Sequence, residues 1–478
     1  MKFAQSVRYI IFVATFVWTV LISAHPKPAH RITVKLSGIS DTTLYLANYF
    51  GKNVYKVDSA RVDGTGMAIF EGEKPLGQGI YLVYLDGNNF FEFLVGSDQT
   101  FDIEAHFSEP VKNKFSGAEE SVTFHQYQSF LASQRDRQLK LQQALTNHSA
   151  IADSVKAIGA RLSALNDEME QYWETQSQKF KGQFLGDFFR SMLLPRQPLF
   201  EPSERDKNPD SLRWANRYHF IRNHFWDNFN FTQPGFVRTP LIDEKLETYF
   251  KRSLLQIPDS MIHPAIEVAG RAKVNPEMYQ YILLYLLNMS NQSEIMGMES
   301  LFVSLAKKYV LTGEASFLDS VSQSKIANKV RLTEPNMIGR IAPDLKLPDS
   351  EGNYYSLRQM NGPITLLYFW EPNCSHCQKT TPELFKDLYI PLRNKGVEVF
   401  AVCTQPNRDE WMEAIQKYGI HEWTNVWDPL NSSNFRHLYD ISTTPVLYIL
   451  DAHKKIIAKR IDVPTAFKFI QQYLGQQH

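Results

Sequence analysis

Cysteine is scarce in this chain of 478 residues, which contains three: Cys374, Cys377 and Cys403. A scaffold held together by disulfides needs many more, so the stability of this chain has to come from apolar cores. Cys374 and Cys377 form a Cys-x-x-Cys motif, and Cys403 stands alone. This usage makes the paired cysteines better candidates for redox chemistry than for structural cross-links.

Charge of one sign is not in excess either. Lys and Arg together number 51, as do Asp and Glu, and hydrophobic residues make up 43% of the chain. Because positive and negative residues are equal in number, the composition does not indicate binding to nucleic acid. A protein or a small molecule is therefore the expected partner. The length and composition predict a globular protein of two or three domains.

Long apolar runs are missing except near the N-terminus. Lys2 and Arg8 precede an uncharged, apolar run over residues 9–21. Ile22-Ser23-Ala24 then offers a cleavage site of the small-residue type. The run is shorter than the roughly 20 residues that a spanning helix needs. It predicts a signal peptide over 1–24 and a periplasmic protein; an uncleaved anchor, the alternative, would add membrane contact.

Alternating apolar residues characterise the next segment, from Arg31 to about Phe115. Ile32, Val34 and Leu36 alternate with polar residues, and turn-forming residues separate several such stretches. Short strands at this spacing predict an antiparallel β-sandwich, assigned to residues 25–118. Its residues include no catalytic constellation, so we interpret it as a scaffold or recognition domain.

Proline is absent between Pro110 and Pro195, and residues 119–335 predict a central all-α region. Apolar residues recur there at heptad spacing in one stretch, namely Ile151, Val155, Ile158, Leu162, Leu165, Met169 and Tyr172. The stripe predicts packing against the chain's own helices, with a homodimer through 151–172 as the alternative.

An aromatic stretch follows within the helical region. Trp214, Tyr218 and Phe225 fall at helical spacing and are predicted to belong to the core, although a peptide-binding groove is an alternative. His219 and His224 do not share a helix face, so no metal site is expected there.

Strands alternate with helices from residue 336 to the end, which predicts an α/β sheet covered on both faces. The whole chain is thus expected to be multidomain α+β. Within 336–478 we expect strands at 364–369, 397–402, 445–450 and 455–460, and helices at 381–393, 409–418 and 465–474.

Several residues of this segment are similar to those of one family. They are Phe369-Trp370 before the motif, Cys374 and Cys377, Pro382, Thr443-Thr444-Pro445, and Ala342-Pro343-Asp344 near the start. On these residues, 336–478 resembles the thioredoxin fold, specifically the exported TlpA/ResA-type thioredoxin-like proteins. The preceding residues resemble uncharacterised modules fused to such domains in envelope proteins.

The resemblance implies an extracytoplasmic thiol-disulfide oxidoreductase that acts on protein substrates, together with an envelope electron donor or acceptor. Cys374 would attack a substrate disulfide and Cys377 would resolve the mixed disulfide. Pro445 would be a cis proline, and Thr444 would offer backbone groups to an extended substrate. Trp370 would pack under the motif. No cofactor and no metal are expected.

His376 bears on the direction of electron flow. An imidazole between the cysteines is able to stabilise the Cys374 thiolate and so raise the reduction potential, whereas a merely solvated histidine is the alternative. Two positions depart from the family pattern: Tyr368 and Thr380 stand where related proteins hold an acid. Reduction and isomerisation therefore both remain open.

Cys403 is expected to be a small buried apolar residue. A zinc site is disfavoured because no second pair of ligands follows, and a peroxidase is disfavoured because the Pro-x-x-x-Thr-x-x-Cys pattern is absent. The remaining alternative is a non-catalytic envelope binding or scaffold protein with a vestigial thioredoxin domain.

Overall fold

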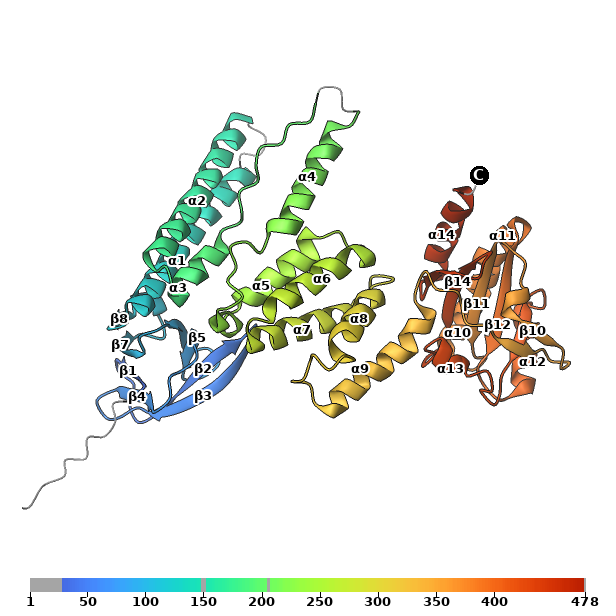
Figure 1. The fold of residues 1–478 in the computed structure, drawn as a ribbon, viewed down its shortest axis with the longest axis horizontal. Helices are drawn as coiled ribbons and strands as arrows, with labels where there is room; N and C mark the ends of the chain where they lie inside the picture. The colour runs from blue at the N-terminus through green and yellow to red at the C-terminus, as the bar shows by residue number, and fades with distance from the viewer. Residues whose placement is uncertain (1–27, 148–151, 204–206, 477–478) are drawn as a thin grey trace, which may run out of the picture. The chain divides into compact units, whose positions relative to one another are not determined.

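The computed structural model describes residues 28–147, 152–203 and 207–476, so the predicted signal peptide lies outside the described residues. The chain divides into two compact units, one of Met1–Asn48 with Tyr55–Gly159 and one of Tyr49–Val54 with Ala160–His478. None of the described helices is both long and apolar enough to cross a membrane. Figure 1 shows the order of the elements along the chain.

Two four-stranded sheets enclose one apolar core in the N-terminal part, ordered β4-β1-β7-β8 and β3-β2-β5-β6. Alternation along the strands explains the packing, because in β7 every second side chain is buried. The predicted β-sandwich is confirmed. Its strands are β1 (His30–Leu36), β2 (Thr43–Phe50), β3 (Asn53–Arg61), β4 (Met67–Gly72), β5 (Gly79–Tyr84), β6 (Phe90–Val95), β7 (Thr100–Ala105) and β8 (Lys114–Ser116).

One strand pair of the sandwich is parallel, whereas the sequence predicted antiparallel pairing. β1 pairs with β7 in parallel, which places Ile32 opposite Phe101 and Val34 opposite Ile103. Alternation marks which face of a strand is buried but says nothing about the direction of its partner. The other pairs of this sheet, β1 with β4 and β7 with β8, are antiparallel.

The middle of the chain is helical, as predicted. The heptad stripe lies on α2, where Ile158 and Leu165 are buried and Val155 is exposed, while Ile151 lies outside the described residues. The helices are α1 (Glu119–Asn147), α2 (Ala152–Lys179), α3 (Phe184–Met192), α4 (Pro209–His224), α5 (Leu241–Glu247), α6 (Pro258–Ala272), α7 (Pro276–Asn291), α8 (Glu299–Leu305) and α9 (Ser320–Thr333).

The predicted core position of Trp214 is wrong. Its side chain is 55% exposed on α4, where it stacks on Tyr218 with ring centroids 5.5 Å apart. Phe225 is buried as predicted, and it contacts the neighbouring buried ring of Trp226. Helical spacing identifies side chains that share a face, but it does not show whether another element covers that face.

The C-terminal sheet has the order β13-β12-β11-β14-β15. β11, β12 and β13 are parallel, β14 runs antiparallel to β11, and β15 antiparallel to β14. The strands are β11 (Ile364–Trp370), β12 (Val397–Cys403), β13 (Thr424–Trp427), β14 (Val446–Asp451) and β15 (Ile456–Lys459), and a separate hairpin joins β9 (Lys346–Pro348) to β10 (Tyr354–Ser356).

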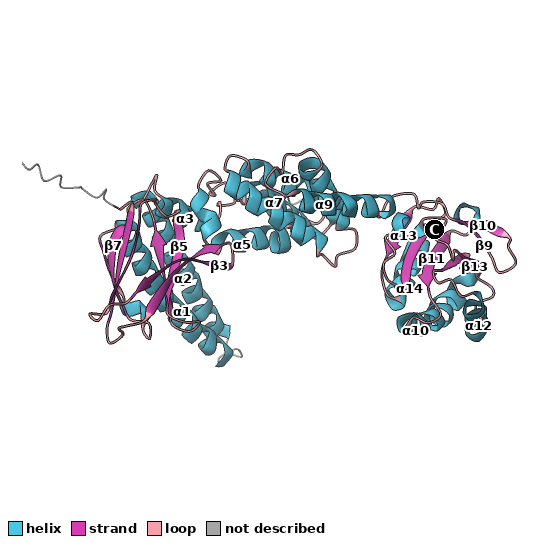
Figure 2. Cartoon of the chain, turned by 90° about the horizontal axis from the view of Figure 1, so that it is seen from below, coloured by secondary structure: helices cyan, strands magenta, loops and turns pink. Residues whose placement is uncertain are grey.

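Helices and loops cover both faces of this sheet (Figure 2). All seven residues of β11 are buried because the strand is central and has an apolar layer on each side. One layer includes residues of α10 (Ser375–Glu383), α12 (Arg408–Tyr418) and α14 (Val463–Gly475), and the other includes α13 (Phe435–Leu438) and the β9–β10 hairpin. The predicted α/β architecture is confirmed, although β13 was not foreseen.

Candidate active site

Cys374 occupies the N-cap of α10, four residues after the end of β11. A buried strand therefore delivers the motif to the carboxyl edge of the sheet, and the helix begins at Ser375. Cys374 is half-buried and Cys377 is buried, and both are free thiols. The N-terminus of a helix presents unpaired N–H groups, which favour a thiolate at this position.

Two opposing effects act on Cys374. Burial by itself raises the pKa of its thiol, but hydrogen bonds outweigh burial and hold this pKa below its ordinary value. The bonds come from the N–H groups of Cys377 and His376, the thiol of Cys377 and the side chain of Thr444. Because the thiolate is the nucleophile in disulfide exchange, Cys374 has the environment of a reactive cysteine.

Cys377 lies in the opposite environment. Burial raises the pKa of its thiol to about 12, and the backbone N–H of Glu371, 3.4 Å from Sγ, only partly offsets this. At neutral pH the Cys377 sulfur is a thiol, so it becomes a nucleophile only when it loses a proton. The two cysteines are thus chemically distinct in one turn of helix.

Thr444 and Pro445 lie next to Cys374 although they are about 70 residues away in the sequence. The peptide bond between them is cis, as predicted. The Cys374 Sγ lies 3.3 Å from the carbonyl oxygen of Thr444 and donates a hydrogen bond to it. The structure therefore brings the backbone before Pro445 into direct contact with the candidate nucleophile.

Trp370 and Cys403 belong to the apolar layer that packs against the cysteine motif. They occupy paired positions of β11 and β12, and both are fully buried in the same apolar layer as Cys377. Burial also raises the pKa of Cys403 to about 12. The placement of Trp370 under the motif and the burial of Cys403 agree with what the sequence predicts.

Tyr368 and Thr380 are the two positions at which the family resemblance predicts an acid. Tyr368 is fully buried, and its hydroxyl oxygen lies 3.0 Å from Oγ1 of Thr381. Burial raises the pKa of Tyr368 far above its ordinary value, so this hydroxyl stays protonated at neutral pH and is a poor acceptor for a thiol proton. Thr381, which lies one turn after Cys377 on α10, was not predicted from the sequence to contact Tyr368.

The carboxylate of Glu371 is held by residues of other elements. Its carboxylate accepts a hydrogen bond of 2.5 Å from Oγ1 of Thr404, and Arg436 lies 3.9 Å away. This network fixes the backbone N–H of Glu371 near Cys377. Thr404 and Arg436 were missed by sequence reasoning, because they are 33 and 65 residues away along the chain and no local pattern links them.

His376 is exposed on the first turn of α10. Its backbone N–H, rather than its imidazole, takes part in lowering the pKa of Cys374. Across residues 28–147, 152–203 and 207–476, no three His, Cys, Asp or Glu side chains gather closely enough to hold a metal ion.

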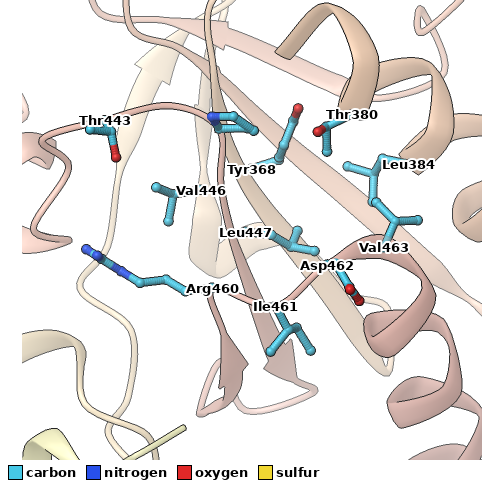
Figure 3. A pocket seen from close by; sticks show the side chains of 11 residues that line it. Tyr368, Thr380, Leu384, Thr443, Val446, Leu447, Arg460, Ile461, Asp462 and Val463 are labelled. Atoms are coloured by element: carbon cyan, nitrogen blue, oxygen red, sulfur yellow. The ribbon is translucent and has the colours of Figure 1, made fainter. Parts of the chain in front are cut away.

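A cavity of about 330 Å³ opens beside Pro445. Figure 3 shows its lining, with Thr443, Val446 and Arg460 toward one end and Val463 and Asp462 toward the other. The remaining residues that line it are Tyr368, Thr380, Leu384, Pro445, Leu447 and Ile461. The cavity therefore joins the cis proline to the helix that carries the cysteines.

Comparison with known proteins matches three segments of the chain. The AhpC/TSA family model covers residues 338–459, and two domains of unknown function, DUF4369 and DUF5106, cover 30–124 and 211–336. A thiol-disulfide oxidoreductase ResA of Bacillus thuringiensis subsp. konkukian is 35% identical over 120 residues, which make up 25% of this chain and 67% of the relative. The chain belongs to the ResA family of thiol-disulfide oxidoreductases.

Two further matches each cover about a third of the chain. ResA of Bacillus thuringiensis strain Al Hakam is 24% identical over 156 residues, which are 33% of this chain and 84% of that protein. A solved domain of a possible thiol-disulfide isomerase from Cytophaga hutchinsonii is 39% identical and covers 30% of this chain and 95% of its own, with a TM-score of 0.28. The AhpC/TSA match over residues 338–459, the sheet topology described above and the ResA relationship together identify the C-terminal segment as an oxidoreductase domain of thioredoxin-like fold.

Proposed function

We propose that this protein exchanges disulfides with protein substrates through Cys374 and Cys377. The observation that carries the proposal is the contrast between its thiols. Cys374 is half-buried with a lowered pKa, whereas Cys377 and Cys403 are buried with raised pKa values. One accessible nucleophile beside one protected thiol is the arrangement that disulfide exchange requires.

In the reducing direction the first step is attack by the Cys374 thiolate on one sulfur of a substrate disulfide. The substrate S–S bond breaks, a mixed disulfide with Cys374 forms, and the other substrate sulfur leaves as a thiolate. The lowered pKa of Cys374 favours this step because it increases the fraction of thiolate at neutral pH.

In the second step Cys377 loses its proton and attacks Sγ of Cys374. The mixed disulfide breaks, the Cys374–Cys377 disulfide forms, and the second substrate sulfur leaves. Two electrons pass to the substrate, and its two sulfurs take up the two protons given up by the protein thiols. An external dithiol then has to reduce the enzyme again. The reverse sequence oxidises a substrate dithiol.

The raised pKa of Cys377 makes loss of its proton the demanding part of the second step. Tyr368 stays protonated, and the Glu371 carboxylate is engaged by Thr404. We infer that solvent entering from the side of the cavity, or the departing substrate thiolate, accepts this proton. Trp370 limits access from below because it is fully buried beneath the motif.

Thr444 is proposed to bind the substrate backbone. Its carbonyl oxygen lies 3.3 Å from Cys374 Sγ, so an extended peptide beside it would place a cysteine within reach of the nucleophile. His376, exposed beside Cys374, is proposed to influence the redox potential mainly through its backbone N–H.

Export is part of the proposal and rests on the N-terminal sequence pattern over 1–24. The predicted organisation continues with a β-sandwich domain over 25–118, a helical domain over 119–335 and a thioredoxin-like domain over 336–478. The first two are proposed to position substrate in the periplasm, and an envelope electron donor or acceptor is the expected redox partner. A homodimer through 151–172 stays an alternative prediction.

The test is reduction of a model protein disulfide by purified protein with a small dithiol as electron donor. We expect Cys374→Ser to abolish activity and Cys403→Ser to retain it. Equal activity in both variants would contradict the proposal. Inactivity of the wild type toward both disulfides and dithiols would favour the non-catalytic scaffold alternative.

A further inference from the structure

We propose that Arg460 selects substrates that carry an acidic residue within two positions of the reacting cysteine. The inference rests on the proposed function and adds a substrate class to it. It depends on where Arg460 lies, on how its charge is balanced, and on the path that an extended substrate would take past Pro445.

Arg460 lies at the edge of the cavity beside Pro445. It directly follows β15, and its backbone N–H donates to the carbonyl of Leu447, 2.8 Å away. Its φ angle is +55°, a left-handed conformation in which asparagine and glycine are more usual than arginine. An arginine at this backbone position is therefore better explained by its side chain than by its conformational preference.

The guanidinium lies on the Thr443 side of the cavity (Figure 3). Its Nη2 donates to the carbonyl oxygen of Asp440 at 2.6 Å and lies 3.4 Å from the Asp440 carboxylate, and the Tyr448 hydroxyl is a further partner. A guanidinium has five N–H donors in a fixed plane. These contacts therefore orient the group while leaving it capacity to bind a carboxylate.

The charge of Arg460 is only partly balanced. The Asp440 carboxylate is shared, because Nζ of Lys329 lies 3.3 Å from the same oxygen. With the neighbouring ion pair of Lys459 and Glu299 included, three cations face two anions at this corner, which leaves a net positive charge. The guanidinium side chain is 43% exposed, so an incoming carboxylate could reach it.

Asp462 is the other charged residue in the lining, and it lies at a different end of the cavity (Figure 3). Its carboxylate caps α14 by accepting a hydrogen bond of 2.8 Å from the N–H of Thr465. The cavity is therefore polarised, with its cation near Thr443 and its anion near Val463. An acidic substrate side chain fits the first end and is repelled from the second.

A substrate extended along Thr443 and Thr444 would run between Cys374 and this cation. Successive residues of an extended chain advance about 3.3 Å, and alternate side chains point the same way. A side chain one or two positions from the substrate cysteine would then lie over Val446 and Arg460. A carboxylate there could form a charge-assisted hydrogen bond with the guanidinium.

The experiment compares three mixed-disulfide peptides that differ at the positions flanking the cysteine, with Glu, Gln or Lys. We measure kcat/KM for their reduction by the full chain. Because the ion pair is partly exposed, we expect Glu to be preferred over Lys by about threefold to tenfold at low salt. The preference for the Glu peptide should decrease at high salt, because salt screens the interaction between exposed charges. The wild-type protein alone is enough for this measurement.

Arg460→Glu should reverse the order of the Glu and Lys peptides. Arg393→Glu is the matched control, because Arg393 has a similar exposure, pairs with Glu422 and precedes β12, which lies on the other side of the central strand β11 from β15. It changes the net charge equally and should keep the wild-type order. Arg460→Asn, whose side chain suits a positive φ, should abolish the preference without loss of folding.

The outcomes separate the two proposals. If no peptide is reduced, the proposed function fails. If all peptides are reduced at equal rates, or if Arg393→Glu alters the order as much as Arg460→Glu, the function stands and the selectivity of Arg460 is rejected.

Discussion

The thiol of Cys374 donates a 3.3 Å hydrogen bond to the carbonyl oxygen of Thr444, the residue that precedes the cis proline Pro445. The reactive sulfur and the backbone edge proposed to bind substrate are thus in contact. A peptide that pairs with this backbone would arrive with its cysteine already beside the nucleophile. We expect this proximity to position a bound substrate for attack by Cys374.

The first prediction concerns the reactivity of the three thiols toward iodoacetamide. Because hydrogen bonds lower the pKa of Cys374, its alkylation rate should fall with decreasing pH around a midpoint below 9.0, the ordinary value for a cysteine. Above that midpoint the rate should level off. Cys377 and Cys403, with pKa values raised to about 12, should react slowly in the folded protein. Peptide mapping by mass spectrometry identifies the labelled residue, and preferential labelling of Cys403 would contradict the assignment.

The second prediction distinguishes the backbone of His376 from its imidazole. His376→Ala retains the N–H that faces Cys374, so the alkylation midpoint should stay near that of the wild type. His376→Pro removes this donor at a position in the first helical turn where proline is tolerated, and the midpoint should rise. A rise of equal size in His376→Ala would instead indicate that the imidazole stabilises the thiolate.

The third prediction concerns the buried hydroxyl pair of Tyr368 and Thr381, whose oxygens lie 3.0 Å apart. Tyr368→Phe leaves the Thr381 hydroxyl buried without this partner and should lower the free energy of unfolding by about 1–3 kcal/mol. Adding Thr381→Val should recover part of that loss, since both polar groups are then removed. Denaturant unfolding of the two single variants and the double variant measures the coupling. Strictly additive losses would show that the pair does not interact.

The fourth prediction concerns Cys403, which packs fully buried opposite Trp370. Cys403→Ser places a hydroxyl in an apolar layer and should cost about 1–3 kcal/mol of stability. Cys403→Ala, the control, should cost less because it introduces no polar group. Neither change should reduce disulfide-exchange activity at temperatures where the protein is folded, and a loss of activity in the stable Ala variant would assign Cys403 a chemical role.

The sequence could predict features that depend on local patterns. Alternation located the sandwich strands, and the continuous apolar run marked the central strand β11. These two predictions succeeded because each depends on residues close together in the chain. The family motif pointed to Cys374, Cys377 and Pro445, whose roles stay predictions. The strand β13 was missed because Thr424–Trp427 is only four residues long and contains two polar residues.

Other features depend on contacts between distant segments. The parallel pairing of β1 with β7, the link from Glu371 to Thr404, and the sharing of Asp440 by Lys329 and Arg460 all join residues separated by 20 or more positions. Trp214 illustrates the same limit, because its helical spacing was correct while its side chain is 55% exposed in the described structure. The spacing of apolar residues shows which side chains share one face of a helix. Only the tertiary structure shows whether another element packs against that face.

The most direct test of the account is to trap its covalent intermediate. Cys377→Ser removes the resolving thiol, so a substrate peptide disulfide should remain attached to the protein through Cys374. Intact mass followed by peptide mapping measures the adduct and its position, with Cys374→Ser/Cys377→Ser as the control. We predict one peptide per chain, linked to Cys374 and released by dithiothreitol. No adduct, or an adduct on Cys403, would contradict the assignment of Cys374 as the nucleophile.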